Sequence, residues 1–260
     1  MYIADAKKPN APEEPKKPAK KMDFPFQKST RIQLSYERSL KGIAREVKRL
    51  IYSYSPTDMA SVERLKRALV AYAELIEPWA RKVTERLLKE TIYRNLRTWK
   101  QHTREMSEAL RKEIGQTSVG DRVKDLMEQN VTLIKSIPLE AAQKVHEKVI
   151  NNLTQGKRYT EFVEDIQSVG GITLSRATLI ARTESGRASS TLVQAQAEDI
   201  GSEGYIWRTS GDLIVRKSHK EMNGKFVKWT EPPTLDKMIG HAGCLPNCRC
   251  WPEPVVPDID

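Results

Sequence analysis

Over most of the chain, apolar residues recur with the spacing of amphipathic helices. From Thr30 onward they fall at steps of three and four residues, which places them on one face of a helix. The pattern predicts one helix beginning near Thr30 and a very long helical stretch over residues 59–114. Pro78 should kink or restart this stretch, and Gly115 is a plausible end signal. The simplest interpretation is an elongated N-terminal hairpin of long packed helices.

Prolines and glycines divide the next part of the chain. Helix-breaking residues and capping side chains predict four further helices. These are residues 120–137 ending before Pro138, residues 139–153, a short helix capped by Thr160 and broken by Gly170-Gly171, and a helix from Thr173 towards Ile200. Gly201 should end the last of them.

After Gly201 the helical period stops and short β-rich segments follow. The predicted elements are a strand at 205–209, a helix at 214–222 with Asp212 at its N-cap, a turn at Asn223-Gly224, a strand at 225–229, a loop at 232–247 and a short strand at 249–251. We therefore expect a mainly α protein with a small C-terminal α+β domain. Trp207, Trp229 and Trp251 lie on the predicted strands, where packing in the core is favoured over a base-stacking platform.

Composition divides the 260 residues into four parts. Residues 1–28 contain five prolines and seven lysines and few apolar side chains, which predicts a flexible basic Pro/Lys-rich arm. The other expected parts are long basic helices at 29–117, the helical part of a second region at 118–202, and a small α+β module at 203–256. No apolar run is long enough for a membrane span and no secretory signal is visible, so we expect no membrane partner.

The net positive charge of the chain comes entirely from its N-terminal half. Residues 29–117 hold nineteen Lys and Arg against eleven acidic residues, and the arm holds seven Lys against four. Residues 118–260 are close to neutral, with eighteen basic and nineteen acidic residues. The N-terminal half is therefore expected to meet a polyanion such as DNA or an acidic protein surface. A purely structural helical hairpin is the alternative.

Several polar residues have the spacing of an acid–base site. Asp212, Arg216 and His219 would share one face of a helix, and Arg182 and Glu184 precede them on another. The sequence shows no nucleophile elbow and no phosphate-binding glycine loop. We favour a structural polar network that pins a small sheet against a helix, with an enzyme using Asp212 and His219 as the alternative.

A second set of residues has side chains that bind zinc. It consists of His219, His241, Cys244, Cys248 and Cys250. The spacing of Cys244 and Cys248 suits a zinc site. If Cys248 and Cys250 lie in an extended strand, however, they point to opposite faces, and only one can reach a metal. We therefore favour small buried cysteines without a cofactor, and zinc is the alternative.

The motifs of the C-terminal half, taken together, resemble a known family. In order they are Ala181-Arg-Thr-Glu184, Trp207-x-Thr209-x-x-Asp212, Arg216-x-x-His219, Asn223-Gly224, Pro232-Pro233, Gly240-His241-Ala242 and Asn247-Cys-Arg-Cys250, preceded by segments 129–138 and 170–177. This order is similar to that of the phage Mu F-like minor head proteins of tailed phages (phage head morphogenesis domain). The resemblance covers roughly residues 121–254.

The resemblance implies a structural virion component and not an enzyme. It implies a role in early head morphogenesis at or near the portal, and contact with packaged double-stranded DNA. The implied partners are the portal protein and, as further candidates, the major capsid or scaffolding protein. The implied location is the host cytoplasm during assembly and the phage head afterwards. The alternatives are a nuclease or toxin-like transferase, and a zinc-dependent nucleic-acid-binding module.

Overall fold

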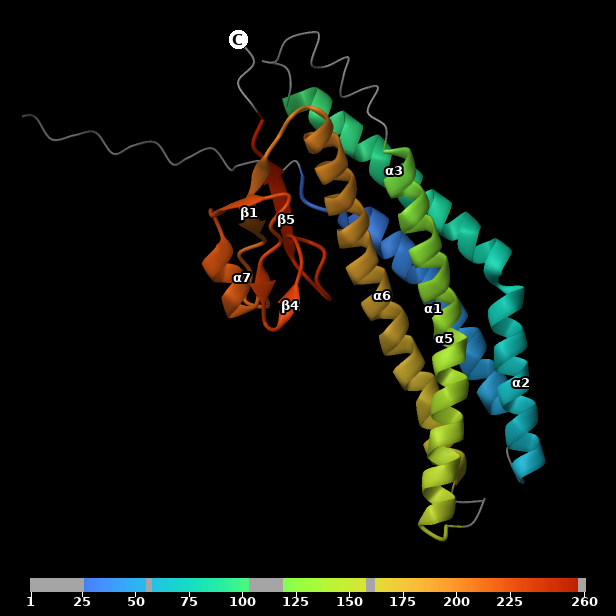
Figure 1. Cartoon of the computed structure of the whole chain (residues 1–260). Helices are drawn as coiled ribbons and strands as arrows, with labels where there is room; N and C mark the ends of the chain where they lie inside the picture. The colour runs from blue at the N-terminus through green and yellow to red at the C-terminus, as the bar shows by residue number, and fades with distance from the viewer. Residues whose placement is uncertain (1–25, 55–57, 103–118, 158–161, 257–260) are drawn as a thin grey trace, which may run out of the picture.

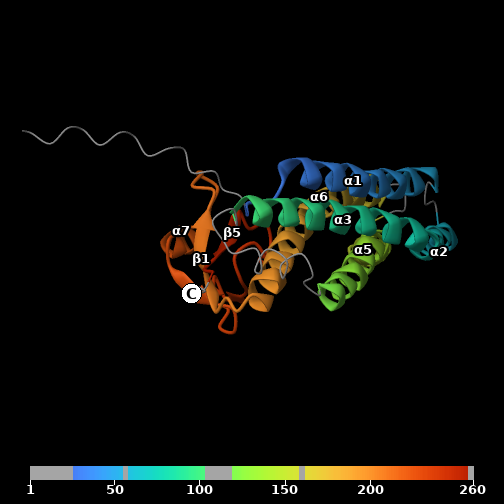
Figure 2. The same cartoon turned by 90° about the horizontal axis from the view of Figure 1, so that it is seen from above.

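The computed structural model describes residues 26–54, 58–102, 119–157 and 162–256, and it is mainly helical with a small antiparallel sheet near the C-terminus. The predicted fold class is confirmed. The helices are α1 (Thr30–Ser53), α2 (Met59–Leu75), α3 (Glu77–His102), α5 (Gly120–Thr154), α6 (Phe162–Asp199) and α7 (Lys217–Met222). The five long helices form an elongated body, and the sheet lies beside the C-terminal half of α6 (Figures 1 and 2). The predicted arm up to Phe26, the stretch at 103–114 with Gly115, and the predicted cap at Thr160 lie largely or wholly outside the described residues.

Local capping explains where the first helices begin. The Ser29 side chain accepts a hydrogen bond from the backbone N–H of Ile32 at the start of α1. Asp58 and Ser61 form a reciprocal capping box at the start of α2. Only Ile76 separates α2 from α3, and Pro78 lies in the first turn of α3, where its missing N–H costs nothing. The predicted restart at Pro78 is confirmed.

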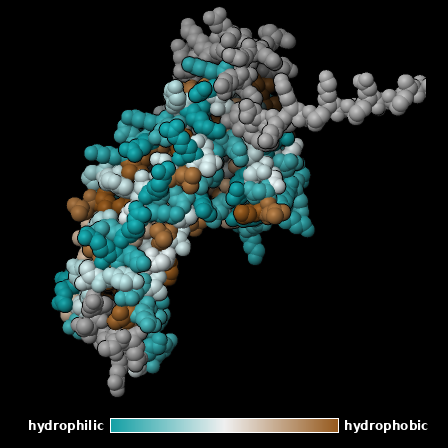
Figure 3. All heavy atoms as spheres, turned by 180° about the vertical axis from the view of Figure 1, so that it is seen from behind, coloured by the Kyte–Doolittle hydropathy of each residue, from teal (hydrophilic) through white to brown (hydrophobic). Residues whose placement is uncertain are grey.

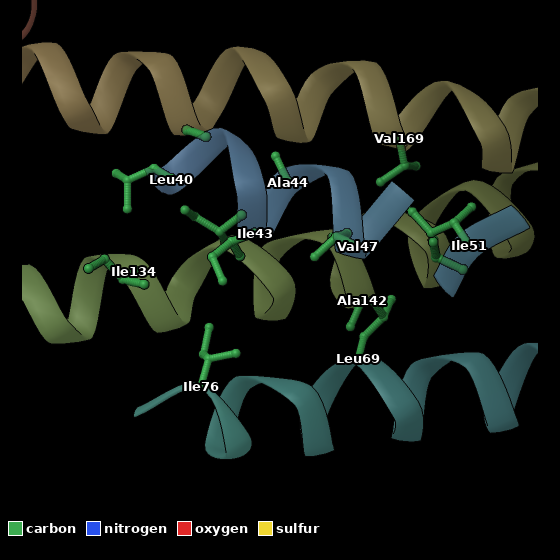
Figure 4. Close-up of a cluster of buried hydrophobic side chains, with 14 of the residues drawn as sticks. Leu40, Ile43, Ala44, Val47, Ile51, Leu69, Ile76, Ile134, Ala142 and Val169 are labelled. Carbon is green, nitrogen blue, oxygen red and sulfur yellow. The ribbon is translucent and has the colours of Figure 1, made fainter. Parts of the chain in front are cut away.

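Helix α1 lies at the centre of the main core. Its apolar face packs mainly against α6, and α2 packs mainly against α5. Figure 4 shows α1 side chains between those of the neighbouring helices: Leu40, Ile43, Ala44, Val47 and Ile51 of α1, with Val169 of α6, Ile134 and Ala142 of α5, and Leu69 and Ile76 of α2. The N-terminal helices are thus completed by α5 and α6 and share one core with them.

The predicted helix end at Pro138 is wrong. Pro138 lies inside α5 and is buried, and the apolar side chains around it belong to the main core. A proline inside a helix costs about 3 kcal/mol. Burying a large aliphatic side chain contributes about 1.5–3 kcal/mol, so Ile134 and Ile137 together offset that cost.

The predicted break at Gly170-Gly171 is also wrong, because both glycines lie inside α6. A Cβ added at Gly170 would lie 2.8 Å from Cγ of Lys48 on α1. Gly170 therefore allows close approach of the two helices and does not end α6. Gly171 faces outward, with nothing within 4 Å of an added Cβ.

The sheet contains the three predicted strands. They are β1 (Gly204–Thr209), β2 (Phe226–Lys228) and β5 (Cys250–Pro254), in the antiparallel order β2-β1-β5. A two-stranded hairpin of β3 (Thr234–Leu235) and β4 (Met238–Ile239) occupies part of the segment predicted as a loop. Its turn residues Asp236 and Lys237 have φ of 52° and 64°, a conformation that the sequence did not indicate.

Helix α7 is shorter than predicted, and Asp212 is not its N-cap. Arg216 occupies the N-cap position. The Asp212 carboxylate instead accepts the backbone N–H of Ile214 at 3.1 Å in a local turn. Asp212, Arg216 and His219 consequently do not share one helical face.

The sheet and the end of the helical body share a second core. The three tryptophans of the strand region are buried, as predicted, and Trp207 is fully buried. Phe26 and Trp99 join this core, with their ring centroids 5.0 Å apart. The end of the segment predicted as a flexible arm is therefore packed against α3 and the sheet.

Hydrophilic side chains dominate the face of the molecule shown in Figure 3, with hydrophobic ones scattered along the helical body. Leu213 and Ile214 are the most exposed of the large hydrophobic residues near the sheet, at 96% and 75%.

Within the described residues, no helix combines the length and apolarity needed to cross a membrane.

Candidate functional site

The loop at residues 240–248 is docked on α6 through close backbone contact. A Cβ added at Gly186 of α6 would lie 2.8 Å from the carbonyl oxygen of Gly243, and one added at Gly243 would collide with Ser190. Thr183 accepts the backbone N–H of Asn247 through its hydroxyl at 3.1 Å. The Ala181–Glu184 motif thus supplies one of the contacts that position the cysteine-rich end of the chain.

His241 packs against Tyr205 and Trp229, whereas His219 packs against Trp207 and the two thiols. Its Nδ1 lies 3.3 Å from the Tyr205 hydroxyl, which also accepts the backbone N–H of Ala242 at 3.1 Å. The His241 ring packs edge-on against Trp229, with centroids 5.9 Å apart. Burial lowers the pKa of His241 below its usual value, so a neutral ring is favoured. These contacts give His241 a packing role.

The first three residues of the predicted polar network each have a different partner. Arg182 on α6 lies 3.8 Å from the Glu37 carboxylate of α1. Glu184 is buried and pairs with Arg187 at 3.6 Å, and burial raises the pKa of Glu184. Asp212 pairs with Arg249 at 2.8 Å. These contacts join neighbouring elements, but they do not form the single network that we expected.

Asp236 brings the remaining two members of that network together. Its carboxylate lies 3.9 Å from Nε of Arg216 and 4.0 Å from Nε2 of His219, and it accepts the Ser218 hydroxyl at 3.0 Å. Arg216 also donates to the carbonyl of Pro246 at 2.7 Å. Sequence reasoning missed Asp236 because only the unpredicted β3–β4 turn carries it to this place.

His219 lies against two thiols. Its Nδ1 is 3.5 Å from Sγ of Cys248 and 3.4 Å from Sγ of Cys250, and the three ligand atoms lie within 4.8 Å of one another. All three side chains are buried, and the Trp207 ring packs edge-on against His219. We call His219, Cys248 and Cys250 the thiol–imidazole cluster.

Cys248 and Cys250 would face opposite ways only if both lay in an extended strand, and this condition is not met. Only Cys250 belongs to strand β5, which begins at that residue. Asn247 has a φ of 53° and turns the chain just before Cys248. The two cysteines therefore do not follow the alternation of a strand, and both sulfurs reach His219.

The three cysteines are all free but differ in environment. Hydrogen bonds from Cys250 and from His219 lower the pKa of the Cys248 thiol. The pKa of Cys250 is raised, because its proton is shared with Cys248 and because it is buried. Burial raises the pKa of Cys244 to about 12. Cys244 lies outside the cluster, so it is a chemically matched control for the other two.

A basic cleft of about 440 Å³ lies beside Cys250. Lys28, Arg182 and Arg249 line it, and burial lowers the pKa of Lys28 to about 8. Lys28 donates to the backbone carbonyl of Arg182 at 3.0 Å, and the two arginines already face Glu37 and Asp212. The three cationic side chains of this cleft are thus largely engaged in contacts within the fold.

An acid–base pair of Asp212 and His219 is not formed. Asp212 is held by Arg249 and accepts the Ser210 hydroxyl at 2.9 Å. His219 faces the two thiols on one side and Asp236 on the other. The chemistry that this region offers is soft-ligand binding by sulfur and imidazole.

Comparison with known families agrees with the motif order. Residues 143–252 match the family model described as Phage Mu protein F like protein. This range covers the last third of α5, all of α6 and nearly all of the sheet, including the thiol–imidazole cluster. The resemblance is therefore confirmed over this part of the chain.

Three relatives match parts of the chain. An uncharacterized protein of Haemophilus influenzae is 33% identical over 139 residues, which is 54% of this chain and 30% of that protein. A protein of Enterococcus faecalis named NAD(+)--arginine ADP-ribosyltransferase EFV is 33% identical over 131 residues, 46% of this chain and 27% of that protein. Minor head protein GP7 of Bacillus phage SPP1 is 26% identical over 140 residues, 49% of this chain and 42% of that protein.

The chain thus spans less than half the length of each of these curated relatives. No solved structure matches it at a comparable level of significance.

Proposed function

We propose that this chain is a structural minor head protein of a tailed phage that acts in early head morphogenesis. The proposal is supported by the match of residues 143–252 to the Phage Mu F-like family and, separately, by the similarity of the chain to a relative named as a minor head protein. The protein would be located in the phage head, after synthesis in the host cytoplasm.

A non-enzymatic role fits the site better than a transferase or nuclease role. The relative named as an ADP-ribosyltransferase is matched over only 27% of its length, so most of that protein has no counterpart in the match. The sequence-based enzyme alternative needed Asp212 and His219 to act together, but they have separate partners. We therefore assign the domain to assembly.

The proposed direct partner is the portal protein, and the major capsid or scaffolding protein is the competing candidate. The test uses the full chain and the portal ring encoded by the same phage or prophage. Native mass spectrometry should show a complex of defined stoichiometry between the two. Binding to the capsid or scaffolding protein, with no portal complex, would contradict the portal assignment and leave the head assignment standing.

The second part of the proposal is that the chain contacts packaged DNA through side chains of α3. Five exposed cationic side chains and one exposed tyrosine recur at steps of three and four residues on this helix. They are Lys82, Arg86, Lys89, Tyr93, Arg97 and Lys100, which we call the α3 basic stripe. At 1.5 Å per residue the stripe is about 27 Å long.

The charges of the stripe are mostly available to a ligand. In the described part of the chain, only Lys89 of these cations forms a salt bridge, with Glu85. Glu85 and Glu90 flank the stripe on either side and leave its centre basic. A stripe of this kind suits sequence-independent contact with phosphates, and the tyrosine adds a planar surface. A solvated helix face is the alternative that the experiment must exclude.

The test measures binding of the full chain to duplex DNA at several salt concentrations. Replacing Arg86 and Arg97 together by Gln should weaken binding and reduce the slope of log K against log salt by about 1.8, or 0.9 for each lost phosphate contact. Lys220 and Lys225 are exposed residues of the C-terminal module, and replacing both by Gln makes the same charge change. Equal weakening by the two double variants would refute a specific role for α3.

A further inference from the structure

The thiol–imidazole cluster has an arrangement that hydrogen bonding alone does not explain. A neutral imidazole has one nitrogen lone pair, and here Nδ1 of His219 faces both Cys248 and Cys250 at nearly equal distances. Whether Nδ1 donates or accepts, it can form a direct hydrogen bond with only one of the two sulfurs at a time. Small apolar cysteines packed for volume have no need to converge on one polar atom.

The distances match those that a tetrahedral metal imposes. With zinc–sulfur bonds of about 2.3 Å and a zinc–nitrogen bond of about 2.0–2.1 Å, tetrahedral geometry places sulfur and nitrogen roughly 3.6 Å apart. The two observed separations are 3.5 Å and 3.4 Å. The three side chains therefore already hold their donor atoms close to the positions that a bound ion would require.

The second nitrogen of His219 is oriented as in metal sites. Nε2 faces the Asp236 carboxylate at 4.0 Å and is buried, with no hydrogen-bond partner among the described residues. Metal-bound histidines typically present their other ring nitrogen to a carboxylate, which fixes the ring and increases its basicity. Ser218 and Arg216 hold Asp236 in turn. Asp236 is thus a positioning residue for His219.

We propose that His219, Cys248 and Cys250 bind one Zn²⁺ ion through Nδ1 and the two sulfurs, with a fourth position left for a water molecule. Both sulfurs bind as thiolates, and any proton that they still carry is released to solvent, so two thiolates and a neutral imidazole balance the charge of the ion in a buried site. His241 and Cys244, the other two members of the set predicted from the sequence, take no part. The proposal does not depend on the role in the phage head.

The ion would join three segments of the C-terminal module. His219 comes from α7, Cys248 from the loop docked on α6, and Cys250 from the first residue of β5. The sheet has only three short strands, and small modules of this kind gain stability from a metal that links their segments. Zinc therefore has a structural role in this site.

The experiment measures metal content in the full chain, purified without a histidine tag and without chelator. We expect about one zinc per chain in the wild type and in the Cys244→Ser control, and less than about a tenth of that in Cys248→Ser and Cys250→Ser. Asp236→Asn keeps the side-chain size and tolerates the left-handed turn. It should weaken zinc affinity about 10–100-fold without abolishing binding.

A second measurement keeps the proposal testable if the cysteine variants do not fold. Cobalt(II) added to chelator-treated wild type should give thiolate-to-cobalt charge-transfer absorption, and zinc should bleach it. Zinc at about a thousand times its Kd should raise the Tm by on the order of 10 °C. Wild type that carries no zinc and gives neither the absorption nor the Tm shift would overturn the proposal. Loss of metal from Cys244→Ser equal to the loss from Cys248→Ser would also overturn it.

Discussion

Two glycines of α6 provide a matched test of how the cysteine-rich loop is docked. Gly186 and Gly171 lie in the same helix and differ in what an added methyl group would meet. At Gly186 it would lie 2.8 Å from the carbonyl oxygen of Gly243, whereas at Gly171 it would meet nothing within 4 Å. Alanine at either position should strengthen the helix itself, because glycine in a helix is about 0.8–1.0 kcal/mol less favourable than alanine.

The structure predicts opposite signs for the two substitutions. Gly171→Ala should stabilise the protein by about 0.5–1 kcal/mol. Gly186→Ala gains the same helix term but must displace the backbone at Gly243, and overpacking of this kind costs about 1–3 kcal/mol. Gly243 has a φ of 86° and is confined by Ser190 on its other side, so the loop has little room to yield. The two variants should therefore differ by about 1–3 kcal/mol.

Chemical unfolding of the full chain, followed by tryptophan fluorescence and by circular dichroism, measures this difference. Trp207, Trp229 and Trp251 report the sheet core, while circular dichroism reports chiefly the helices. We expect Gly186→Ala to lower the midpoint of the fluorescence transition and Gly171→Ala to raise the midpoint of the helical one. If Gly186→Ala stabilises the protein as much as Gly171→Ala does, the loop is not packed on α6 as described.

Two further substitutions test the interior of the C-terminal module. Trp207→Ala should lower the free energy of unfolding by about 3–5 kcal/mol, because the side chain is fully buried. Trp79 is 36% exposed, so Trp79→Ala should lower it much less. Equal losses of stability in the two variants would show that the sheet core is misplaced. Glu184→Gln should raise stability at neutral pH, because burial raises the pKa of the folded-state carboxyl. The folded protein then holds this proton more tightly, so the Glu184 contribution is most favourable below the ordinary pKa of 4.5 and declines as the pH rises above it. The advantage of the variant should therefore vanish towards pH 4.5, and an advantage independent of pH would contradict this account.

Features that depend on local periodicity were predictable from the sequence. The start of α1, the restart at Pro78 and the three strands of the sheet follow from capping residues and from apolar spacing over a few residues. The order of the C-terminal motifs also identified the family correctly. Each of these signals is contained in a short stretch of chain.

Features that depend on a distant partner were not predictable. Pro138 and Gly170 look like helix breakers until their tertiary neighbours are known. The proline is buried in the main core, and the glycine lies against Lys48. Phe26 looked like part of an arm, but it packs against Trp99, 73 positions further along the chain.

The candidate site was only partly predictable for the same reason. The sequence identified His219, Cys248 and Cys250 as candidate zinc ligands. It could not show that they lie together while His241 and Cys244 lie outside the cluster. That separation depends on the turn at Asn247 and on the end of the sheet at which each residue lies. Nothing in the sequence identified Asp236 as part of the site. It reaches His219 through the turn of a short hairpin, and that turn was not predicted because it contains no glycine.

Quantitative mass spectrometry of purified heads tests the central claim most directly. The heads would come from the phage or prophage that encodes this chain, separated from tails and from host protein. The account predicts that the chain remains with the heads through purification, in a copy number far below that of the major capsid protein. Heads that lack the chain at every stage of assembly, while the protein is present in the producing cell, would contradict the account.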